Sequence, residues 1–206
     1  MIHPTLKTAL RPLALTLVLP LALGGCISLF PKAKPVQLYS FGAGVPAAAA
    51  PAARGVTVAK GATTFPPAAQ GDRLLTSTGA EQAYIGGARW AGPASVLFDD
   101  VVVKAFDASP VRLVQRGEPL SAASMLRMDV RTFEARYPGP SVVVQVRATL
   151  IRNTDRTIIA EKMFESTVPA SDNRQTAIVA GFDSAVGKVV GDIRDWTQAN
   201  APPPAR

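Results

Sequence analysis

Histidine and cysteine are almost absent from this chain of 206 residues, which contains one of each, His3 and Cys26. His3 lies in an N-terminal segment with the pattern of a cleaved signal, so the mature chain is expected to have no histidine. Without histidine there is no base for Ser-His-Asp or Cys-His catalysis. Clusters of histidine and cysteine that bind zinc or iron are excluded as well.

Several other chemical motifs are missing. No P-loop pattern occurs, and the "GAG" of residues 42–44 lacks the third glycine and the preceding strand of a dinucleotide fingerprint. Ser184 and Lys188 stand one helical turn apart, but two residues on the outer face of a helix explain them better than a Ser–Lys dyad. Asp99 and Asp100 are neighbours on a predicted helix and point about 100° apart, a poor geometry for acid–base work. We therefore predict a binding or assembly protein with no catalytic, cofactor-binding or metal-binding residues.

Charged residues are few and dispersed. They make up 18% of the chain against 48% hydrophobic residues, a balance typical of a folded domain. The formal net charge is +7, and loss of Lys7 and Arg11 with the signal would leave 20 basic and 15 acidic residues, or +5. The basic residues occur singly, without the clusters and interleaved aromatics of nucleic-acid-binding proteins. This pattern excludes nucleic acid and allows a weak attraction to anionic lipid headgroups.

The N-terminus has the features of a secretory signal. Residues 1–12 carry Lys7 and Arg11 and no acidic residue, and residues 13–23 form an apolar run that contains a proline. This run of eleven residues is shorter than the ~20 that a membrane-spanning helix needs. A basic segment followed by a short apolar one is typical of a signal peptide.

The tetrapeptide Leu23-Gly24-Gly25-Cys26 resembles the bacterial lipobox. In that motif the cysteine thiol receives a diacylglyceryl group, cleavage makes the cysteine the new N-terminus, and its amine is then usually acylated. The alternative is an ordinary signal peptide with an incidental cysteine. One acyl chain holds a protein to a membrane only marginally, whereas two or more hold it stably. By resemblance to enterobacterial lipoproteins, Ile27 in place of aspartate predicts export to the periplasmic face of the outer membrane.

The predicted domain organisation follows from these features. We expect a lipoprotein signal peptide at 1–25, an acylated N-terminus and spacer at 26–35, one domain at 36–198 with an Ala/Pro-rich loop at 42–54, and a disordered tail at 199–206.

Most of the predicted domain is strand. Apolar alternation and turn residues predict strands at 36–41, 55–59 and 111–116, a hairpin over 73–85 with its turn at 78–81, and an antiparallel meander of strands at 125–137, 141–151 and 157–168.

Two amphipathic helices complete the prediction. The first runs from Gly92-Pro93 to Ser109-Pro110, although the valines at 101–103 are a competing strand signal. The second begins at Asp172 and Gln175, which are spaced as a capping box. Its apolar stripe consists of Ile178, Phe182, Val186, Val189, Ile193 and Trp196. We predict an α+β fold: a mostly antiparallel sheet with both helices packed on one face.

The segment "QAYIGGARWAGP" (82–93), with Arg73 before it and an apolar helix after it, resembles the ABC-type transport auxiliary lipoproteins. A family strand that ends in Arg-Trp is matched by Arg89-Trp90. The family's early Tyr-x-Leu strand appears as Tyr39-Ser40-Phe41, and residues 148–170, "ATLIRNTDRTIIAEKMFESTVPA", are similar to its later region. The resemblance covers about residues 26–198, and the alanine-rich insert at 42–54 departs from it.

The resemblance implies a function in transport across the envelope. Family members work with an MCE-domain protein, an inner-membrane permease and a cytoplasmic ATPase in moving lipids or other hydrophobic molecules. The implied role is auxiliary and non-catalytic, with no cofactor besides the covalent lipid on Cys26. Tyr39, Tyr84 and Trp90 are candidate contacts for partner or lipid, each with the alternative that it is a core aromatic. MCE proteins are hexameric, and a homo-oligomer would preserve that symmetry.

A second interpretation belongs to a different class of protein. A stand-alone outer-membrane lipoprotein that scaffolds the envelope or activates a cell-wall synthase would have the same anchor and the same kind of domain. An enzyme is disfavoured because the mature chain would have no histidine.

Overall fold

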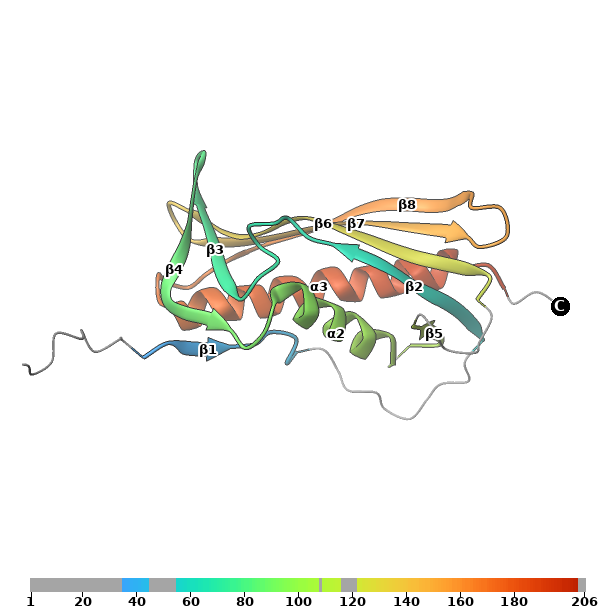
Figure 1. Cartoon of the computed structure of the whole chain (residues 1–206), viewed down its shortest axis with the longest axis horizontal. Helices are drawn as coiled ribbons and strands as arrows, with labels where there is room; N and C mark the ends of the chain where they lie inside the picture. Colours follow the sequence, from blue (N-terminus) through green and yellow to red (C-terminus); the bar gives the residue numbers. More distant parts are fainter. Residues whose placement is uncertain (1–34, 45–54, 108, 116–121, 204–206) are drawn as a thin grey trace, which may run out of the picture. The chain divides into compact units, whose positions relative to one another are not determined.

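The computed structural model describes residues 35–44, 55–107, 109–115 and 122–203 (Figure 1). The described elements lie within one compact unit of the chain, Val36–Arg206. The predicted signal peptide, Cys26 and nearly all of the spacer lie outside the described residues, as do residues 45–54 of the Ala/Pro-rich loop and the end of the tail.

All the strands expected from the sequence are present, with somewhat different bounds. The second strand runs five residues beyond the predicted 55–59, and the second strand of the hairpin continues to Trp90. The strands are β1 (Gln37–Tyr39), β2 (Val56–Thr64), β3 (Arg73–Thr78), β4 (Glu81–Trp90), β5 (Val111–Val114), β6 (Ser124–Tyr137), β7 (Ser141–Arg152) and β8 (Ile158–Pro169).

The long strand β6 organises the eight-stranded sheet. One edge of β6 pairs with β7 in antiparallel register, and β7 pairs in the same way with β8. The other edge carries two strands in succession: β2 pairs with the first part of β6, and β3 pairs with its last residues. Both run parallel to β6, and they lead outward to β5 and to β4 and β1.

The sheet is mixed, and the predicted mostly antiparallel arrangement is wrong. Four of the seven strand pairings among the described residues are parallel: β1 with β4, β2 with β5, β2 with β6, and β3 with β6. The tight turns correctly predicted the hairpin and the meander. The parallel pairs join strands that are distant in the sequence, and helix α2 (Ala94–Asp107) brings the chain back so that β5 starts beside the start of β2.

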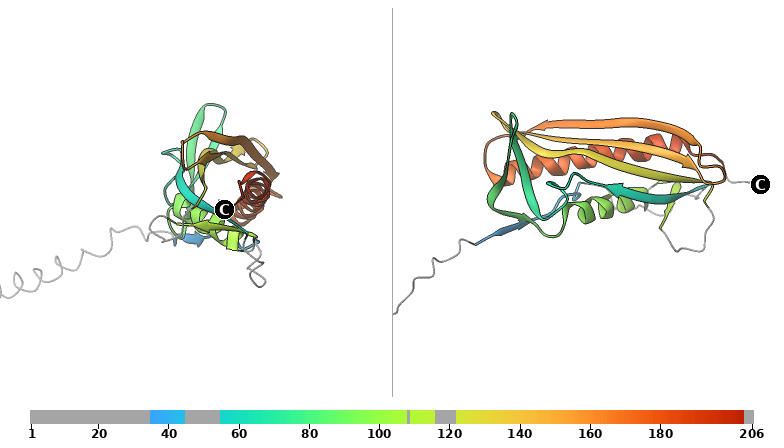
Figure 2. Two further views of the ribbon diagram at one scale, coloured as in Figure 1. Left: turned by 90° about the vertical axis from the view of Figure 1, so that its right-hand side faces the viewer. Right: turned by 45° about the horizontal axis from the view of Figure 1, so that its top comes forward.

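Two helices pack on the sheet, as predicted (Figure 2). Helix α2 buries Phe98, Val102 and Phe106 at a spacing of four residues, so the apolar face prevails over the strand propensity of the valines at 101–103. Helix α3 (Gln175–Asn200) packs along β7 and β8 and buries most of its predicted stripe: Ile178, Phe182, Val186, Val189 and Ile193, with Trp196 partly buried.

The start of α3 differs from the prediction, because no capping box forms. The N-cap residue is Arg174, and its side chain makes no capping hydrogen bond. Asp172 instead accepts hydrogen bonds from the backbone and the side chain of Arg174, and the bond from the Arg174 side chain is the main cause that lowers the pKa of Asp172. Gln175 turns away from the helix end and reaches two strands of the sheet.

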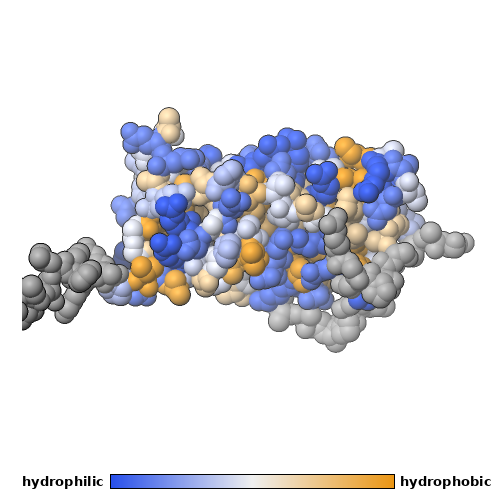
Figure 3. Space-filling view, viewed as in Figure 1, coloured by the Kyte–Doolittle hydropathy of each residue, from blue (hydrophilic) through white to orange (hydrophobic). Residues whose placement is uncertain are grey.

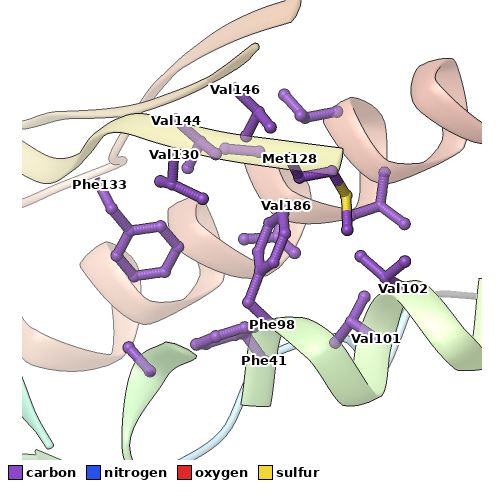
Figure 4. Packing of buried hydrophobic residues seen from close by; sticks show 14 of the residues in the cluster. Phe41, Phe98, Val101, Val102, Met128, Val130, Phe133, Val144, Val146 and Val186 are labelled. Carbon is purple, nitrogen blue, oxygen red and sulfur yellow. The ribbon is translucent and has the colours of Figure 1, made fainter. Parts of the chain in front are cut away.

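Aromatic rings from four parts of the chain meet in the core, and Figure 4 shows two of them, Phe41 and Phe133, among the buried side chains. Phe41, just after β1, lies edge-on to Trp90 at the end of β4, with ring centroids 5.0 Å apart. Trp90 lies edge-on to Phe182 of α3 at 5.2 Å, and Phe182 contacts Phe133 of β6 at 4.9 Å. All four side chains are at least 95% buried, so this aromatic cluster joins the sheet, the N-terminal strand and α3.

Removing the Phe182 ring should destabilise the whole domain. Phe182 is fully buried, and Phe→Ala substitutions in cores cost about 3–5 kcal/mol because a cavity remains. We expect Phe182→Ala to lower the free energy of unfolding by that amount in urea denaturation followed by circular dichroism. Val96→Ala is the matched control: Val96 is 52% exposed on α2, and its loss should change stability by no more than about 0.5 kcal/mol. Equal stability of the two variants would contradict the assigned role of the cluster.

Candidate functional site

The described residues show neither a metal-binding cluster nor a membrane-spanning helix. Among them, no group of three or more histidine, cysteine, aspartate or glutamate side chains could hold a metal ion. One hollow of about 480 Å³ lies beside the hairpin tip, lined mainly by polar residues such as Ser77, Gln82, Glu134 and Arg136. No helix in the described ranges is long and apolar enough to cross a membrane. The candidate functional features are therefore surfaces and the segment that leads from the predicted anchor.

One residue of each polar pair noted in the sequence has a structural partner. Ser184 is exposed on α3, and Lys188 binds Asp192 with a distance of 2.9 Å from Nζ to Oδ2. Asp99 binds Lys60 at 2.8 Å and accepts a hydrogen bond from Thr63 Oγ1 at 2.7 Å. The Lys188–Asp192 pair joins neighbouring turns of α3, and the contacts of Asp99 join α2 to β2.

Strand β1 is where the chain from Cys26 joins the described domain. Its three residues pair in parallel with Ala88, Arg89 and Trp90 of β4, and the backbone N–H of Ala91 donates to Tyr39 O at 2.7 Å. Phe41 follows directly and lies in the aromatic cluster. A strand of three residues makes few ladder hydrogen bonds, so its attachment depends on contacts with other elements.

Two charged side chains hold the segment that follows β1. The backbone N–H groups of Gly42 and Ala43 both donate to Asp183 Oδ1 of α3, at 2.5 and 3.0 Å. Lys104 of α2 donates from Nζ to Gly42 O at 3.3 Å. We call these contacts of Asp183 and Lys104 with residues 42 and 43 the β1 clamp. Since charge-assisted hydrogen bonds are stronger than neutral ones, the clamp fixes the segment to both helices.

Gly42 is the residue that allows this close approach. Its φ of +89° lies in the region that residues with a side chain rarely adopt. A Cβ atom at this position would overlap the side chain of Val101 on α2. Glycine therefore satisfies two requirements here, one of backbone conformation and one of space.

The candidate aromatics lie in different settings. Trp90 is 2% exposed and is part of the core, which was its alternative interpretation. Tyr39 is half-buried, and its hydroxyl donates to Gln175 Oε1 at 3.3 Å, while Gln175 Nε2 donates to Gly86 O at 2.8 Å. Gln175 thus joins β1 and β4 to the start of α3.

Tyr84 supports a cation on the surface. Its hydroxyl donates to Ala68 O at 3.1 Å, and the guanidinium carbon of Arg73 lies 3.8 Å from the centre of its ring. This distance is typical of a cation–π contact. Tyr39 and Tyr84 therefore keep part of their rings accessible while both hydroxyl groups bond within the domain.

Sequence reasoning missed Asp183, Lys104 and the second role of Gln175. Asp183 follows the buried Phe182 of α3, and its partner Gly42 is 141 positions away. The only sequence signal is the glycine pair at 42 and 44, which lacks the further features of a dinucleotide-binding motif.

Loss of the Asp183 carboxylate should loosen β1 selectively. Hydrogen bonds to charged groups contribute about 1.5–3 kcal/mol, so Asp183→Ala should make the amide hydrogens of Gly42 and Ala43 exchange at least about tenfold faster. Hydrogen exchange read by NMR measures this directly. Asp192→Ala is the control, because its exposed pair with Lys188 should contribute less than about 1 kcal/mol. Unchanged exchange at both amides would show that Asp183 does not hold the segment.

Comparisons with known proteins agree with this architecture. The model of the family described as "ABC-type transport auxiliary lipoprotein component" matches residues 39–194. The crystal structure of protein XCC0632 from Xanthomonas campestris, of family DUF330, is similar with a TM-score of 0.69 and 26% identity over 80% of this chain and 96% of that one. No curated protein matches the chain.

Two further crystal structures share the fold at lower identity. An uncharacterized protein has a TM-score of 0.62 with 14% identity, covering 79% of this chain and 98% of its own. The hypothetical protein CT253 from Chlamydia trachomatis has a TM-score of 0.51 with 10% identity, covering 71% and 99%. The resemblance inferred from Arg89-Trp90 and the neighbouring motifs is confirmed by the family match, which spans most of the chain. The chain belongs to the family of ABC-type transport auxiliary lipoprotein components.

Proposed function

We propose that this protein is an outer-membrane lipoprotein, acylated at Cys26, that serves an MCE-type ABC system for lipid transport between membranes. The observation that carries the proposal is the family match over residues 39–194, because this family consists of auxiliary lipoprotein components of ABC-type transport. The proposal also has a more specific part: the partners are an MCE-domain protein, a permease and an ATPase. This part rests on the family resemblance seen in the sequence. The protein itself is non-catalytic in this proposal.

The structure supports an anchored docking component in one respect. The segment that follows the predicted anchor is fixed to the domain by the β1 clamp, by Gln175 and by the burial of Phe41. A domain joined to its anchor in this way has a defined attachment point on its surface. A partner that spans from the inner membrane could then meet the domain at a limited range of heights.

Exchange of Ile27 tests the anchor and its destination. In the proposal, Ile27 permits export to the outer membrane, and Ile27→Asp should retain the protein in the inner membrane. We expect the wild-type protein in the outer-membrane fraction of a density gradient, Ile27→Asp mainly in the inner-membrane fraction, and the control Ile27→Ser with the wild type. Mass spectrometry of the N-terminal peptide should show an acylated Cys26. An unmodified cysteine, or wild-type protein in the inner membrane, would refute this part of the proposal.

Recovery of partners tests the transport role. Tagged full-length protein is crosslinked in membranes, solubilised in detergent and purified, and the bound proteins are identified by mass spectrometry. We expect an MCE-domain protein, and we expect its recovery to fall at least about tenfold for Cys26→Ser, since the unanchored protein loses the high local concentration at the membrane. Recovery of cell-wall enzymes, or of no specific partner, would favour the stand-alone envelope role instead.

A further inference from the structure

Strand β1 and the residue before it expose two large apolar side chains. Leu38 is 66% exposed and Val36 is 48% exposed, and as residues two positions apart along an extended segment they point to the same side. Leu38 is the most exposed of the large hydrophobic residues in the described ranges. Single exposed apolar residues are common on soluble domains. The residues next to Leu38 and Val36 therefore decide whether this is a binding surface.

Basic side chains continue the same row across the sheet. Leu38 pairs in register with Arg89 of β4, and Arg89 pairs in register with Arg73 of β3. Directly paired residues of neighbouring strands project to the same face. We call Val36, Leu38, Arg89 and Arg73 the β1 patch. Figure 3 shows hydrophobic beside hydrophilic surface at the end of the domain where β1 lies in Figure 1.

The β1 patch carries an excess of positive charge. Arg89 binds the carboxylate of Asp72 at 2.7 Å, with about half of both side chains exposed. Arg73 makes no ion pair with any described residue, and its guanidinium lies over the ring of Tyr84. An apolar pair next to a cation on an aromatic platform suits the boundary between lipid headgroups and acyl chains.

The outer face of the β6–β8 meander has a different character. There Arg147 Nε lies 4.0 Å from Glu161 Oε1, and Gln145 Nε2 donates to Glu165 Oε2 at 2.9 Å, so both carboxylates have a polar partner within the face. Thr167 of β8 is exposed on this side. Strand β8 also exposes Ile158 (61%) and Met163 (39%), and the polar residue Thr167 provides a reference position for experiments.

The chain leading to β1 limits where the β1 patch can be. Val36 follows Cys26 by ten residues, which span at most about 35 Å when fully extended. The β1 clamp fixes the other end of the strand to α2 and α3. With Cys26 in the bilayer, this end of the domain stays within that distance of the membrane surface, where even weak contacts are favoured by the high effective concentration.

We propose that the β1 patch binds the surface of the membrane in which Cys26 is anchored, with Leu38 and Val36 among the headgroups and Arg73 and Arg89 at anionic lipid phosphates. This rests on the proposed acylation of Cys26. The contact orients the domain: the β1 patch faces the bilayer, and the β6–β8 meander remains in water.

A fluorescent label reports the contact directly. Full-length acylated Leu38→Cys is labelled with an environment-sensitive dye and reconstituted into vesicles of phosphatidylethanolamine and phosphatidylglycerol (3:1), with labelled Thr167→Cys as the control. The native thiol of Cys26 is blocked by its lipid, which mass spectrometry verifies. We expect the emission of the dye at position 38 to rise at least about twofold on reconstitution into vesicles and to be quenched by doxyl-labelled lipid. Neither effect is expected at position 167.

The charge dependence separates headgroup binding from simple proximity. The double substitution Arg73→Gln and Arg89→Gln in the Leu38→Cys background should reduce the quenching at position 38 at least about twofold. Vesicles of phosphatidylcholine alone, which carry no net charge, should reduce the quenching of the unsubstituted Leu38→Cys protein by a similar factor. Both arginines are exposed, so an unchanged melting temperature is expected and shows that the domain remains folded.

The outcomes distinguish this inference from the function on which it rests. A water-exposed label at position 38 on protein whose Cys26 is acylated overturns the membrane contact and leaves the proposed function intact. Shielding of position 38 that requires an added MCE-domain protein assigns the patch to a protein partner and likewise overturns it. An unacylated Cys26 refutes the proposed anchor itself.

Discussion

The aromatic cluster, in which Trp90 and Phe133 each contact both Phe182 of α3 and Phe41, is the interaction on which the rest of the structure depends. These residues come from a helix, two strands and the segment after β1, so no local element brings them together. Edge-to-face and tilted ring pairs contribute about 0.5–1.5 kcal/mol beyond their buried area. The cluster also positions Gly42 against both helices, because the preceding residue, Phe41, is fixed within it.

Two glycines allow close contacts between the helices and the rest of the domain. A Cβ atom on Gly42 would overlap Val101 of α2, and one on Gly181 would lie 2.8 Å from Val142 Cγ2 of β7. The backbone of the N-terminal segment therefore meets α2 directly, and α3 approaches the sheet more closely than a residue with a side chain permits. In both places the fold is positioned by the absence of a side chain, which no hydrophobic pattern reveals.

The local patterns predicted the elements well and their arrangement only in part. The spacing of Phe98, Val102 and Phe106 predicted α2, and the turn at 153–156 predicted the pairing of β7 with β8. Apolar alternation indicates which face of a strand is buried but not which strand lies beside it, so the parallel pairing of β2 and β3 with β6 was missed. Gln175 was assigned to a capping box on spacing alone, whereas its amide finds partners on β1 and β4. The clamp residues were missed because their partners are distant in sequence.

The β1 clamp has a consequence for the length of the tether between the predicted anchor and the domain. While the clamp holds, the tether ends at Val36, ten residues after Cys26, and reaches about 35 Å at most. Release of residues 36–44 would add at least nine residues and at least about 30 Å of reach, and the domain would be free to rotate about its tether. The effective concentration of a tethered group falls steeply as its tether lengthens beyond the required span. For an anchored auxiliary component, the polar contacts of Asp183 and Lys104 would therefore govern both its height above the membrane and the orientation in which a partner meets it.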